Sequence, residues 1–198
     1  MRNKKAISIS SKLIDESINK INFKGKILDI GARHSPYSNK GNVISLDKFP
    51  YKEVDVIADA EKHIPFKKNS FDMVLLIFVL EYIKNPQKVI DNIYGVLKPN
   101  GKLILTAPFM YPFHPLKKDD DFWRYTPASI KFLLSKFSKI EIIPKGYFLT
   151  LIAIYIEFIL EHLKLHPIIF LLNPLIWLDK KIKLFKNTAV HYFIIAIK

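Results

Sequence analysis

Residues 26–47 read KILDIGARHSPYSNKGNVISLD, and this stretch decides the fold. Two short apolar runs, Lys26–Ile30 and Asn42–Leu46, flank a polar loop, which indicates a strand, a tight turn, a short helix and a second strand. Gly31 follows the first run, and Asp47 follows the second. Glycine lets a backbone approach a ligand closely, and an acid at the tip of the next strand accepts hydrogen bonds from a ribose diol. The stretch therefore predicts a nucleoside site.

Strands and helices alternate at short intervals on both sides of this stretch. The expected elements are a helix over Ile9–Ile21, strands over Lys26–Ile30, Asn42–Leu46, Val54–Ala58, Phe71–Leu80 and Lys102–Ala107, and a helix over Pro86–Lys98. The run FDMVLLIFVL at Phe71–Leu80 is nearly all apolar, which is typical of a strand buried on both faces of a parallel sheet. The alternation predicts an α/β fold with a doubly wound sheet and a ligand at the carboxyl ends of its strands.

The composition sets limits on partners and compartment. With 198 residues and a formal net charge of +13, the chain can bury a sizeable core and has an excess of basic residues. The charge indicates either an anionic partner, such as nucleic acid, a phosphate-bearing substrate or a membrane surface, or the lysine-rich composition of AT-rich coding. The lysines are dispersed, which favours the second explanation. The absence of cysteine excludes disulfides and fits a reducing cytoplasm, and the N-terminus lacks the apolar core of a secretory signal.

The sequence changes character after Ala107. Residues 108–127, PFMYPFHPLKKDDDFWRYTP, form a long segment rich in aromatics, prolines and charges. A loop of this length is usually functional or disordered, and the aromatic content argues against disorder. Thr126 and Pro127 then have the pattern of an N-cap and first turn, so a helix is expected over TPASIKFLLSKF, followed by a strand at Ile140–Ile143.

The most apolar region lies between Phe148 and Leu178. Charged residues and prolines interrupt it, so it predicts two apolar helices and no membrane-spanning one. These helices either cover an edge of the sheet or contact a membrane interface, with Tyr155 and Trp177 near the headgroups and the following lysines on anionic lipid. Ala189–Lys198 is expected to close the chain as a strand.

Three acids fall where a ligand crevice is expected. Asp29, Asp47 and Asp59 each stand at the carboxyl end of a predicted strand, and together they are a stronger signal than any one alone. Asp59 and Ala60 can offer a carboxylate and a backbone amide to an adenine. No G-x-G-x-x-G fingerprint follows the first strand, which disfavours a pyrophosphate ligand. The histidines show no metal-ligand spacing, so no metal site is expected.

The order of ILDIGA, VISLD, DVIADAEKHIPFKKNSFDMVLLIFVLEYIKNPQKVI and VLKPNGKLILTAPF resembles class I S-adenosylmethionine-dependent methyltransferases of the type 11-like group, over about residues 26–110. The segment PFMYPFHPLKKDDDFWRYT is similar to a subgroup with a P-F-x-x-P-x-H…D-x-x-R-x-T pattern, often associated with surface-glycan and lipid-linked saccharide biosynthesis. The resemblance then extends to about residue 137.

The resemblance implies a Rossmann-like sheet, mostly parallel with an antiparallel last strand, and S-adenosylmethionine as cofactor. Asp29 and Gly31 would lie beneath the methionine part, Asp47 would hold the ribose, Asp59 and Ala60 the adenine, and Phe78 would line the sulfonium. The implied cofactor contacts are Asp29, Gly31, Ala32, Asp47, Lys48, Asp59, Ala60 and Phe78. This chain has Ala32 and Arg33 where the family has G-x-G, and Tyr82 where it has histidine.

Three residues of the aromatic loop are the catalytic candidates. If the acceptor is a hydroxyl, a base must remove its proton, and His114 has a suitable reference pKa. Asp121 could orient His114 or act as the base itself, and Arg124 could bind a phosphate or carboxylate of the substrate. The alternative for Arg124 is an ion pair with one of residues 119–121 that holds the loop in place.

The expected function is methyl transfer to an oxygen or nitrogen of a small or lipid-linked saccharide-type acceptor. The protein is expected to be cytoplasmic. One interpretation of the apolar helices is peripheral membrane contact through residues 148–186. Other acceptors, including RNA, remain alternatives, although three consecutive aspartates would repel a phosphate backbone. A degenerate fold that acts as a binding module is a third alternative.

The organisation expected is one domain over 1–198, with an N-terminal helix in 1–25, a cofactor core at 26–110, an active-site loop and helix at 111–137, an apolar helical insertion at 148–186 and a closing strand at 189–198. The sequence leaves the oligomeric state open.

Overall fold

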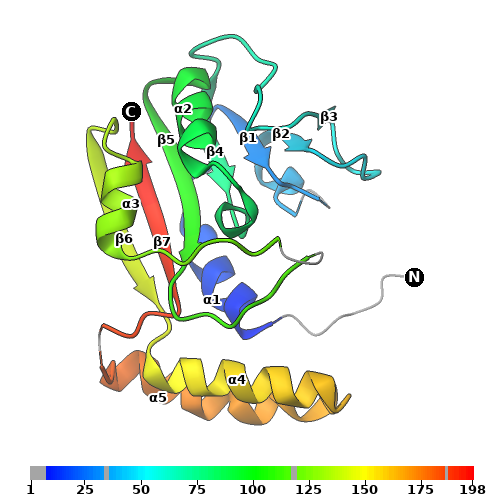
Figure 1. Ribbon diagram of the computed structural model, residues 1–198, viewed down its shortest axis with the longest axis vertical. Helices are drawn as coiled ribbons and strands as arrows, with labels where there is room; N and C mark the ends of the chain where they lie inside the picture. Colours follow the sequence, from blue (N-terminus) through cyan, green and yellow to red (C-terminus); the bar gives the residue numbers. More distant parts are fainter. Residues whose placement is uncertain (1–7, 34–35, 117–119, 186) are drawn as a thin grey trace.

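A computed structural model describes residues 8–33, 36–116, 120–185 and 187–198. Its centre is a seven-stranded sheet in the order β3-β2-β1-β4-β5-β7-β6, with helices on both faces (Figure 1). The strands are β1 Lys26–Ile30, β2 Asn42–Asp47, β3 Val56–Ile57, β4 Phe71–Leu76, β5 Leu97–Pro108, β6 Lys139–Lys145 and β7 His191–Ile197. Strands β1 to β5 pair in parallel, and β7 is antiparallel to both β5 and β6. This confirms the expected doubly wound, Rossmann-like α/β fold.

Five α-helices and three 3₁₀ turns complete the described chain. They are α1 Ile9–Ile18, α2 Pro86–Val96, α3 Pro127–Leu133, α4 Phe148–His162, α5 Asn173–Ile182, η1 Ser38–Lys40, η2 Leu80–Tyr82 and η3 His166–Leu172. Local chemistry sets several of their starts. The Ser8 hydroxyl accepts the N–H of Ser11 at the head of α1, and Thr126 and Ser129 form a reciprocal capping box at the head of α3.

The central strands are buried on both faces because alternate side chains enter different cores. Met73 and Leu75 of β4 pack in the cluster that contains residues of α1, whereas Val74 and Leu76 pack in the cluster beneath α2 and α3. The period-2 alternation of a strand therefore explains why FDMVLL is apolar throughout.

The strand expected over Phe71–Leu80 is wrong in its second half, because β4 ends at Leu76. Beyond it the chain turns: Phe78 has φ +56°, in the left-handed region, and its N–H donates to the Thr106 hydroxyl of β5 at 2.7 Å. Leu80 then begins the turn η2. The apolar run thus continues past the sheet into the wall of the site.

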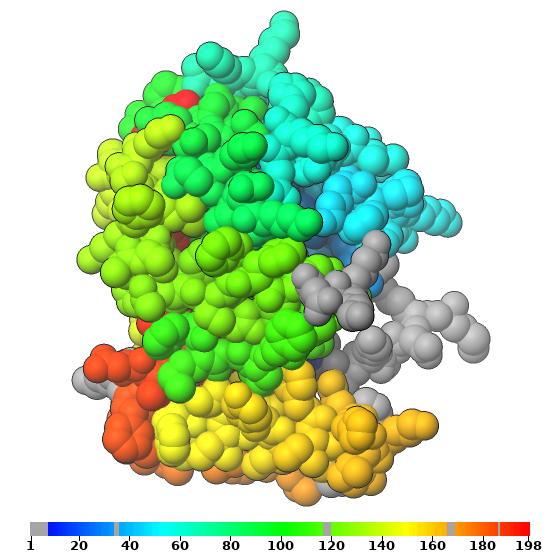
Figure 2. Space-filling view, viewed as in Figure 1, coloured from blue at the N-terminus to red at the C-terminus, as the bar shows by residue number. Residues whose placement is uncertain are grey.

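Helices α4 and α5 lie together at one end of the molecule, beyond the sheet and beside the start of α1 (Figure 1). In the space-filling view they form the lower border of the visible face (Figure 2). They interrupt the connection between β6 and β7, whose ladder runs from Lys139 opposite Ile197 to Lys145 opposite His191. Within the described ranges, no helix has both the length and the apolar character needed to cross a membrane.

Candidate cofactor and acceptor site

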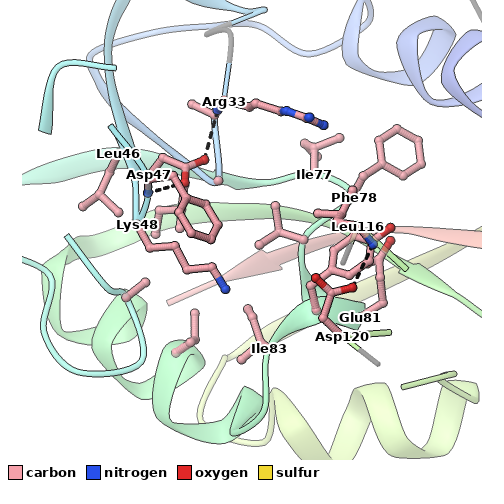
Figure 3. A pocket seen from close by; sticks show the side chains of 18 of the residues that line it. Arg33, Leu46, Asp47, Lys48, Ile77, Phe78, Glu81, Ile83, Leu116 and Asp120 are labelled. Atoms are coloured by element: carbon pink, nitrogen blue, oxygen red, sulfur yellow. Dashed lines mark hydrogen bonds between the residues drawn. The ribbon is translucent and has the colours of Figure 1, made fainter. Parts of the chain in front are cut away.

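A cavity of about 590 Å³ opens at the carboxyl ends of β1, β2 and β4, beneath the loop that follows β5 (Figure 3). Small-molecule sites are commonly about 300–1,000 Å³. Seven of the eight expected cofactor contacts line it, namely Gly31, Ala32, Asp47, Lys48, Asp59, Ala60 and Phe78. The eighth, Asp29, is buried in β1 and does not line the cavity. Of the three catalytic candidates, His114 lines the cavity, and Asp121 and Arg124 do not.

Asp47 ends β2 and is held there by backbone donors. Its Oδ1 accepts the N–H of Phe49 at 2.9 Å, and its Oδ2 accepts the N–H of Arg33 at 3.2 Å. A carboxylate has about four acceptor positions, so these two bonds fix the group and leave capacity for a ligand. A pre-oriented, buried carboxylate at the tip of a strand is suited to two neighbouring hydroxyls.

Asp29 is a buried carboxyl without a full set of partners. Its side chain belongs to a residue only 2% exposed, and Oδ2 has no hydrogen-bond partner within the described part of the chain. Burial, and to a lesser degree the negative charge of Asp47, raise the pKa of Asp29 to about 7. A positive group in the cavity would therefore lower that pKa and favour the carboxylate.

Gly31 is required by the backbone and by its neighbour. Its φ is +73°, and a Cβ added there would lie 2.4 Å from Cγ2 of Val79. The Gly31 N–H donates to the carbonyl of Leu46, the end of β2, at 2.8 Å. The close approach that demands glycine is thus to the Val79 side chain, in the wall of the cavity, and this contact holds the loop against β2 and the end of β4.

Asp59 and Ala60 follow β3 and face the same cavity. Asp59 Oδ1 accepts the N–H of Glu61 at 3.0 Å, which fixes a turn, and the Ala60 carbonyl accepts the amide of Asn92 at 2.8 Å. The Ala60 carbonyl is therefore held by α2. Lys48 is exposed at the rim.

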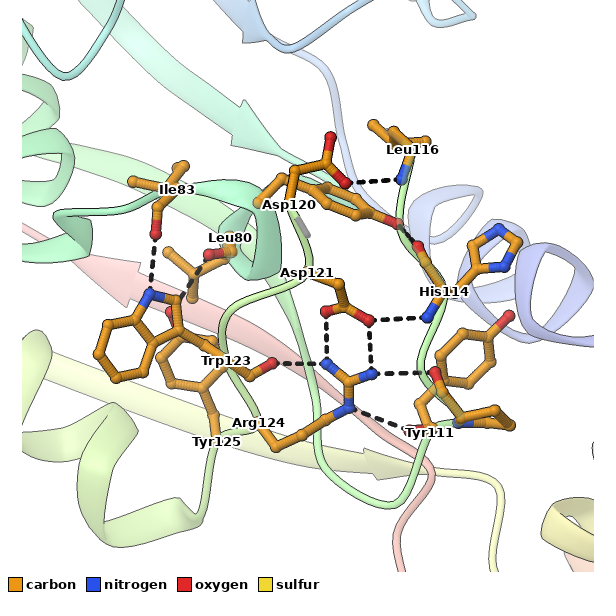
Figure 4. A network of polar contacts seen from close by, with 12 residues as sticks. Leu80, Ile83, Tyr111, His114, Leu116, Asp120, Asp121, Trp123, Arg124 and Tyr125 are labelled. Carbon is orange, nitrogen blue, oxygen red and sulfur yellow. Dashed lines mark hydrogen bonds and ion pairs between the residues drawn. The ribbon is translucent and has the colours of Figure 1, made fainter. Parts of the chain in front are cut away.

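The loop over the cavity is organised around Arg124 (Figure 4). Its Nη1 and Nη2 donate to the two carboxylate oxygens of Asp121 at 2.6 and 2.7 Å. Its remaining donors go to the carbonyls of Tyr111, Pro112 and Trp123 at 2.8–2.9 Å. A guanidinium has five N–H donors, and all five are used. Arg124 therefore forms the ion pair that was expected as the alternative to substrate binding. In this arrangement it has no N–H donor left for a substrate anion.

Asp121 braces the same loop. Its side chain is 2% exposed, and besides Arg124 it accepts the backbone N–H of His114 at 2.8 Å. Burial alone would raise the pKa of Asp121, but the Arg124 hydrogen bonds and the His114 N–H outweigh it and lower the pKa. Asp121 therefore holds the backbone of His114. The exposed imidazole packs edge-on against Phe158 of α4, with ring centroids 5.6 Å apart.

Glu81 is the site residue that sequence reasoning missed. It lies on η2, lines the cavity, is buried, and has an Oε2 without a partner within the described residues. Burial is the main reason that its pKa rises to about 7; the charge of Asp121 adds to this, and its own backbone N–H and Arg124 oppose it. The only sequence signal was an acid within an apolar V-L-E-Y turn.

The loop is bonded directly to η2 and its flanks, which explains the burial of Glu81. The N–H of Phe122 donates to the Glu81 carbonyl at 2.9 Å, and the Tyr82 hydroxyl donates to the His114 carbonyl at 3.0 Å. Trp123 Nε1 also donates to the carbonyl of Ile83 at 2.8 Å. Residues at least 32 positions apart in sequence are thus joined over the cavity.

His191, at the start of β7, was also missed but has a different character. It is fully buried between the rings of Phe78 and Tyr111, at centroid distances of 5.5 and 4.6 Å. Burial, and secondarily the charge of Arg124, lower its pKa to about 3. His191 is thus neutral at physiological pH and acts as packing beneath the cavity.

The cavity is acidic although the chain is basic. Among the described residues that line it, five carry carboxyl groups and two carry lysine or arginine cations: Asp47, Asp59, Glu61, Glu81 and Asp120 against Arg33 and Lys48. The part of the chain that the structure describes has no group of three or more His, Cys, Asp or Glu side chains placed for a metal ion. The excess of carboxyl groups over cations in the lining suits a ligand that carries positive charge.

Comparison with known proteins supports this description. Residues 38–105 match the family described as "Methyltransferase domain". A demethylmenaquinone methyltransferase of Paenarthrobacter aurescens is 30% identical over 138 residues, which cover 62% of this chain and 52% of the relative. The chain spans about half the length of the curated relatives it matches.

Solved structures share the architecture. A Thermotoga maritima protein described as a SAM-dependent methyltransferase, possible histamine N-methyltransferase, superposes with a TM-score of 0.61 at 15% identity, covering 97% of this chain and 90% of that one. The phosphoethanolamine N-methyltransferase 2 of Haemonchus contortus, solved with S-adenosylhomocysteine, gives 0.60 at 18% identity, covering 94% and 52%. The chain thus shares its fold with these methyltransferase structures, and its residues 38–105 match a methyltransferase-domain family.

Proposed function

We propose that this chain is a single-domain methyltransferase that binds S-adenosylmethionine in the cavity and methylates an oxygen or nitrogen of a small or lipid-linked saccharide-type acceptor. The observation that carries the proposal is the set of acids at the strand ends: Asp47 held open by two backbone donors, Asp59 beside it, and Asp29 buried without a partner on Oδ2. A ligand with a ribose diol could bond to the cavity-lining acids, and its positive charge would act on the buried Asp29 only through the field.

The fit to this cofactor can be stated residue by residue. Asp47 would accept the ribose hydroxyls, with Lys48 at the rim, and Asp59 with Ala60 would meet the adenine. Gly31 and Ala32 would border the methionine part above Asp29, and Phe78 would line the reacting end. When bound, the cofactor supplies an activated methyl group, so the protein must chiefly align the acceptor and receive its proton.

Two residues are candidates for that proton. His114 lines the cavity from the loop, as the sequence suggested, and its imidazole is exposed. Glu81 lines it from η2, and its buried Oε2 has no partner within the described chain. With the cofactor bound as methyl donor, either group could receive the proton that a hydroxyl acceptor would give up on methylation. Asp121 and Arg124 would act as positioning residues that fix the loop around His114.

The two candidates can be separated by pH. Loss of a general base costs about 10²–10⁴-fold in rate. If Glu81 is the base, Glu81→Gln loses activity and the acid limb of its pH profile, whereas His114→Asn keeps both. The opposite pattern would assign the proton to His114.

The saccharide-type acceptor rests on the resemblance of residues 108–126 and on hydroxyl groups at this end of the cavity, from Ser8, Ser10 and Ser11. The similarity to a demethylmenaquinone methyltransferase and to a ubiquinone/menaquinone biosynthesis C-methyltransferase favours a second candidate, a quinone-type acceptor methylated on carbon. A lipid-linked acceptor of either kind would agree with the peripheral membrane contact expected through residues 148–186.

The first experiment is calorimetric titration of S-adenosylmethionine and S-adenosylhomocysteine into the folded protein. Micromolar binding of both is expected, and no binding to a folded sample would contradict the proposal. Transfer of labelled methyl groups to a panel of glycosides, glycolipids and demethylated quinones then identifies the acceptor. Label in quinones alone would overturn the saccharide assignment and leave the cofactor assignment intact.

A further inference from the structure

The two C-terminal helices and the turn between them expose many large apolar side chains, which we call the apolar outer surface. Its members are Ile152, Tyr155, Ile159, Leu163, Leu165, Phe170, Leu171, Trp177, Leu178, Ile182, Leu184 and Phe185. Phe170, Leu171 and Trp177 are 62%, 60% and 58% exposed. Gatherings of exposed apolar side chains on this scale mark interaction sites rather than ordinary solvent-facing surface.

Helix α4 shows that this exposure is directional. Ile152, Tyr155 and Ile159 follow one another at helical spacing on its exposed side. Ala153 and Ile154 lie on the opposite side and pack with residues of α1 and η3. The helix therefore has one apolar face that serves the protein core and a second that does not.

On the helix pair of α4 and α5, most acidic side chains are buried and most exposed charged side chains are lysines. Two of its three acids are buried: Glu157 accepts the N–H of Ile9, and Asp179 accepts the N–H groups of Tyr147 and Leu149. Among described residues from 148 to 185, the exposed charged side chains of the helix pair are Lys164, Lys180, Lys181, Lys183 and Glu161, of which Lys180 is ion-paired with Glu16 of α1 at 2.7 Å. The surface offered to a partner is thus apolar with basic margins.

We propose that the apolar outer surface docks on an anionic lipid bilayer. Basic residues beside exposed aromatics suit the boundary between acyl chains and negatively charged headgroups. Lys181 lies over the ring of Trp177 at 4.0 Å, so the indole and an ammonium group are presented together. Association with a second copy through this surface would bring lysines of like sign together, which disfavours that occupant.

Helix α4, which carries part of the docking surface, also borders the cavity through its inward face, at the end lined by Tyr111 and His114. The Phe158 ring of α4 contacts the rings of Tyr111 and His114, at centroid distances of 6.0 and 5.6 Å, and both of those residues line the cavity. Bilayer contact would therefore bring that end of the cavity near the headgroups. This consequence for the acceptor rests on the proposed function, whereas the docking itself does not.

Flotation with vesicles tests the proposal on the full chain. We expect it to float with vesicles of phosphatidylcholine and phosphatidylglycerol and not with phosphatidylcholine alone. Phe170→Ser and Leu171→Ser should each weaken partitioning about tenfold. Phe132→Ser is the matched control, because Phe132 is 80% exposed on α3, away from the helix pair, and it should change nothing.

Charge and depth are tested separately. Lys181→Gln and Lys183→Gln should each weaken partitioning about fivefold, since a lysine near an anionic surface contributes about 1 kcal/mol. Lys88→Gln and Lys131→Gln, on α2 and α3, are the controls. In a Trp123→Phe background Trp177 is the single tryptophan, and its emission should shift to the blue on anionic vesicles.

Each contrary outcome is decisive. Absence of flotation, equal binding to neutral vesicles, or a solution dimer that Phe170→Ser dissociates would overturn the proposal. Titration of S-adenosylhomocysteine into the same samples keeps the two proposals apart. Cofactor binding without flotation contradicts only the membrane surface, and flotation without cofactor binding contradicts only the proposed function.

Discussion

The two ends of the cavity are built in different ways. At the end proposed for the nucleoside, Asp47 and Gly31 lie at the ends of neighbouring parallel strands, so the sheet itself sets their positions. At the end proposed for the acceptor, Glu81 lies on η2 and His114 on the loop, which is held by the five hydrogen bonds of Arg124 and by bonds to η2 and its flanks. The difference teaches that one fold can keep its cofactor chemistry constant while its acceptor chemistry varies through a loop.

Arg124→Ala is the strongest test of whether the two ends of the cavity are independent. It removes five donors and leaves the Asp121 carboxylate, 2% exposed, without its cation. Breaking a buried pair commonly costs about 3–5 kcal/mol, and we expect a loss of that size in the free energy of unfolding by urea titration. Affinity for S-adenosylhomocysteine in the folded variant should change less than threefold, on the order of experimental scatter. A large loss of affinity would show that the two ends are coupled.

A second test uses pH at the acceptor end. Because the folded pKa of Glu81 is raised to about 7 from 4.5, the folded state holds this proton more tightly than the unfolded state. Its stabilising effect is fully present below pH 4.5 and is lost as the pH rises through 7, by about 3 kcal/mol. The stability of the wild type should therefore fall relative to Glu81→Gln across this window in urea titrations. Parallel curves for the two proteins would contradict the buried, unpartnered state of Glu81.

The nucleoside end is tested by Asp47→Ala. Loss of two charge-assisted hydrogen bonds, at about 1.5 kcal/mol each, predicts a cofactor affinity about 100-fold lower in calorimetry. Asp55→Ala is the matched control, since Asp55 accepts both the N–H and the hydroxyl of Ser45 on the same strand but does not line the cavity. Equal loss of affinity in the two variants would indicate a general effect on β2.

The smallest effect concerns backbone shape. Gly31→Ala should lower the free energy of unfolding by about 2 kcal/mol, because it strains a positive φ and meets Val79. Gly95→Ala is the reverse control: no atom lies within 4 Å of its added Cβ, and the substitution in α2 should stabilise by about 0.5–1 kcal/mol. Thermal unfolding of both variants provides the comparison, and a stabilised Gly31→Ala would refute the argument.

Local sequence signals were enough for the sheet and for bringing Gly31, Asp47 and Asp59 to one cavity. The strand at Lys26–Ile30 was predicted with its observed bounds, because an apolar run before Gly31 has few alternatives. They were not enough beyond Leu76, where the turn depends on a bond from Phe78 to Thr106, 28 residues away. Helical and strand periodicities carry no information on such a contact.

The acceptor end depended still more on distant contacts. Three consecutive aspartates were possible ion-pair partners of Arg124 in the sequence. The folded loop shows that the partner is Asp121. Glu81 was missed because residues far along the chain, His114, Phe122 and Trp123 among them, bond to η2 and its flanks, which no local pattern reports.

The two ends of the connection between β6 and β7 are hydrogen-bonded to each other. The N–H of Val190 donates to the carbonyl of Gly146 at 3.0 Å, continuing the β6–β7 ladder up to the point where the helix pair departs. The entropy cost of closing a segment between two fixed ends grows only slowly with its length. The two strands could therefore accept a segment of another length or sequence in place of residues 147–189. Grafting such a segment offers a route to change what this end of the molecule contacts without rebuilding the cavity at the carboxyl ends of the strands.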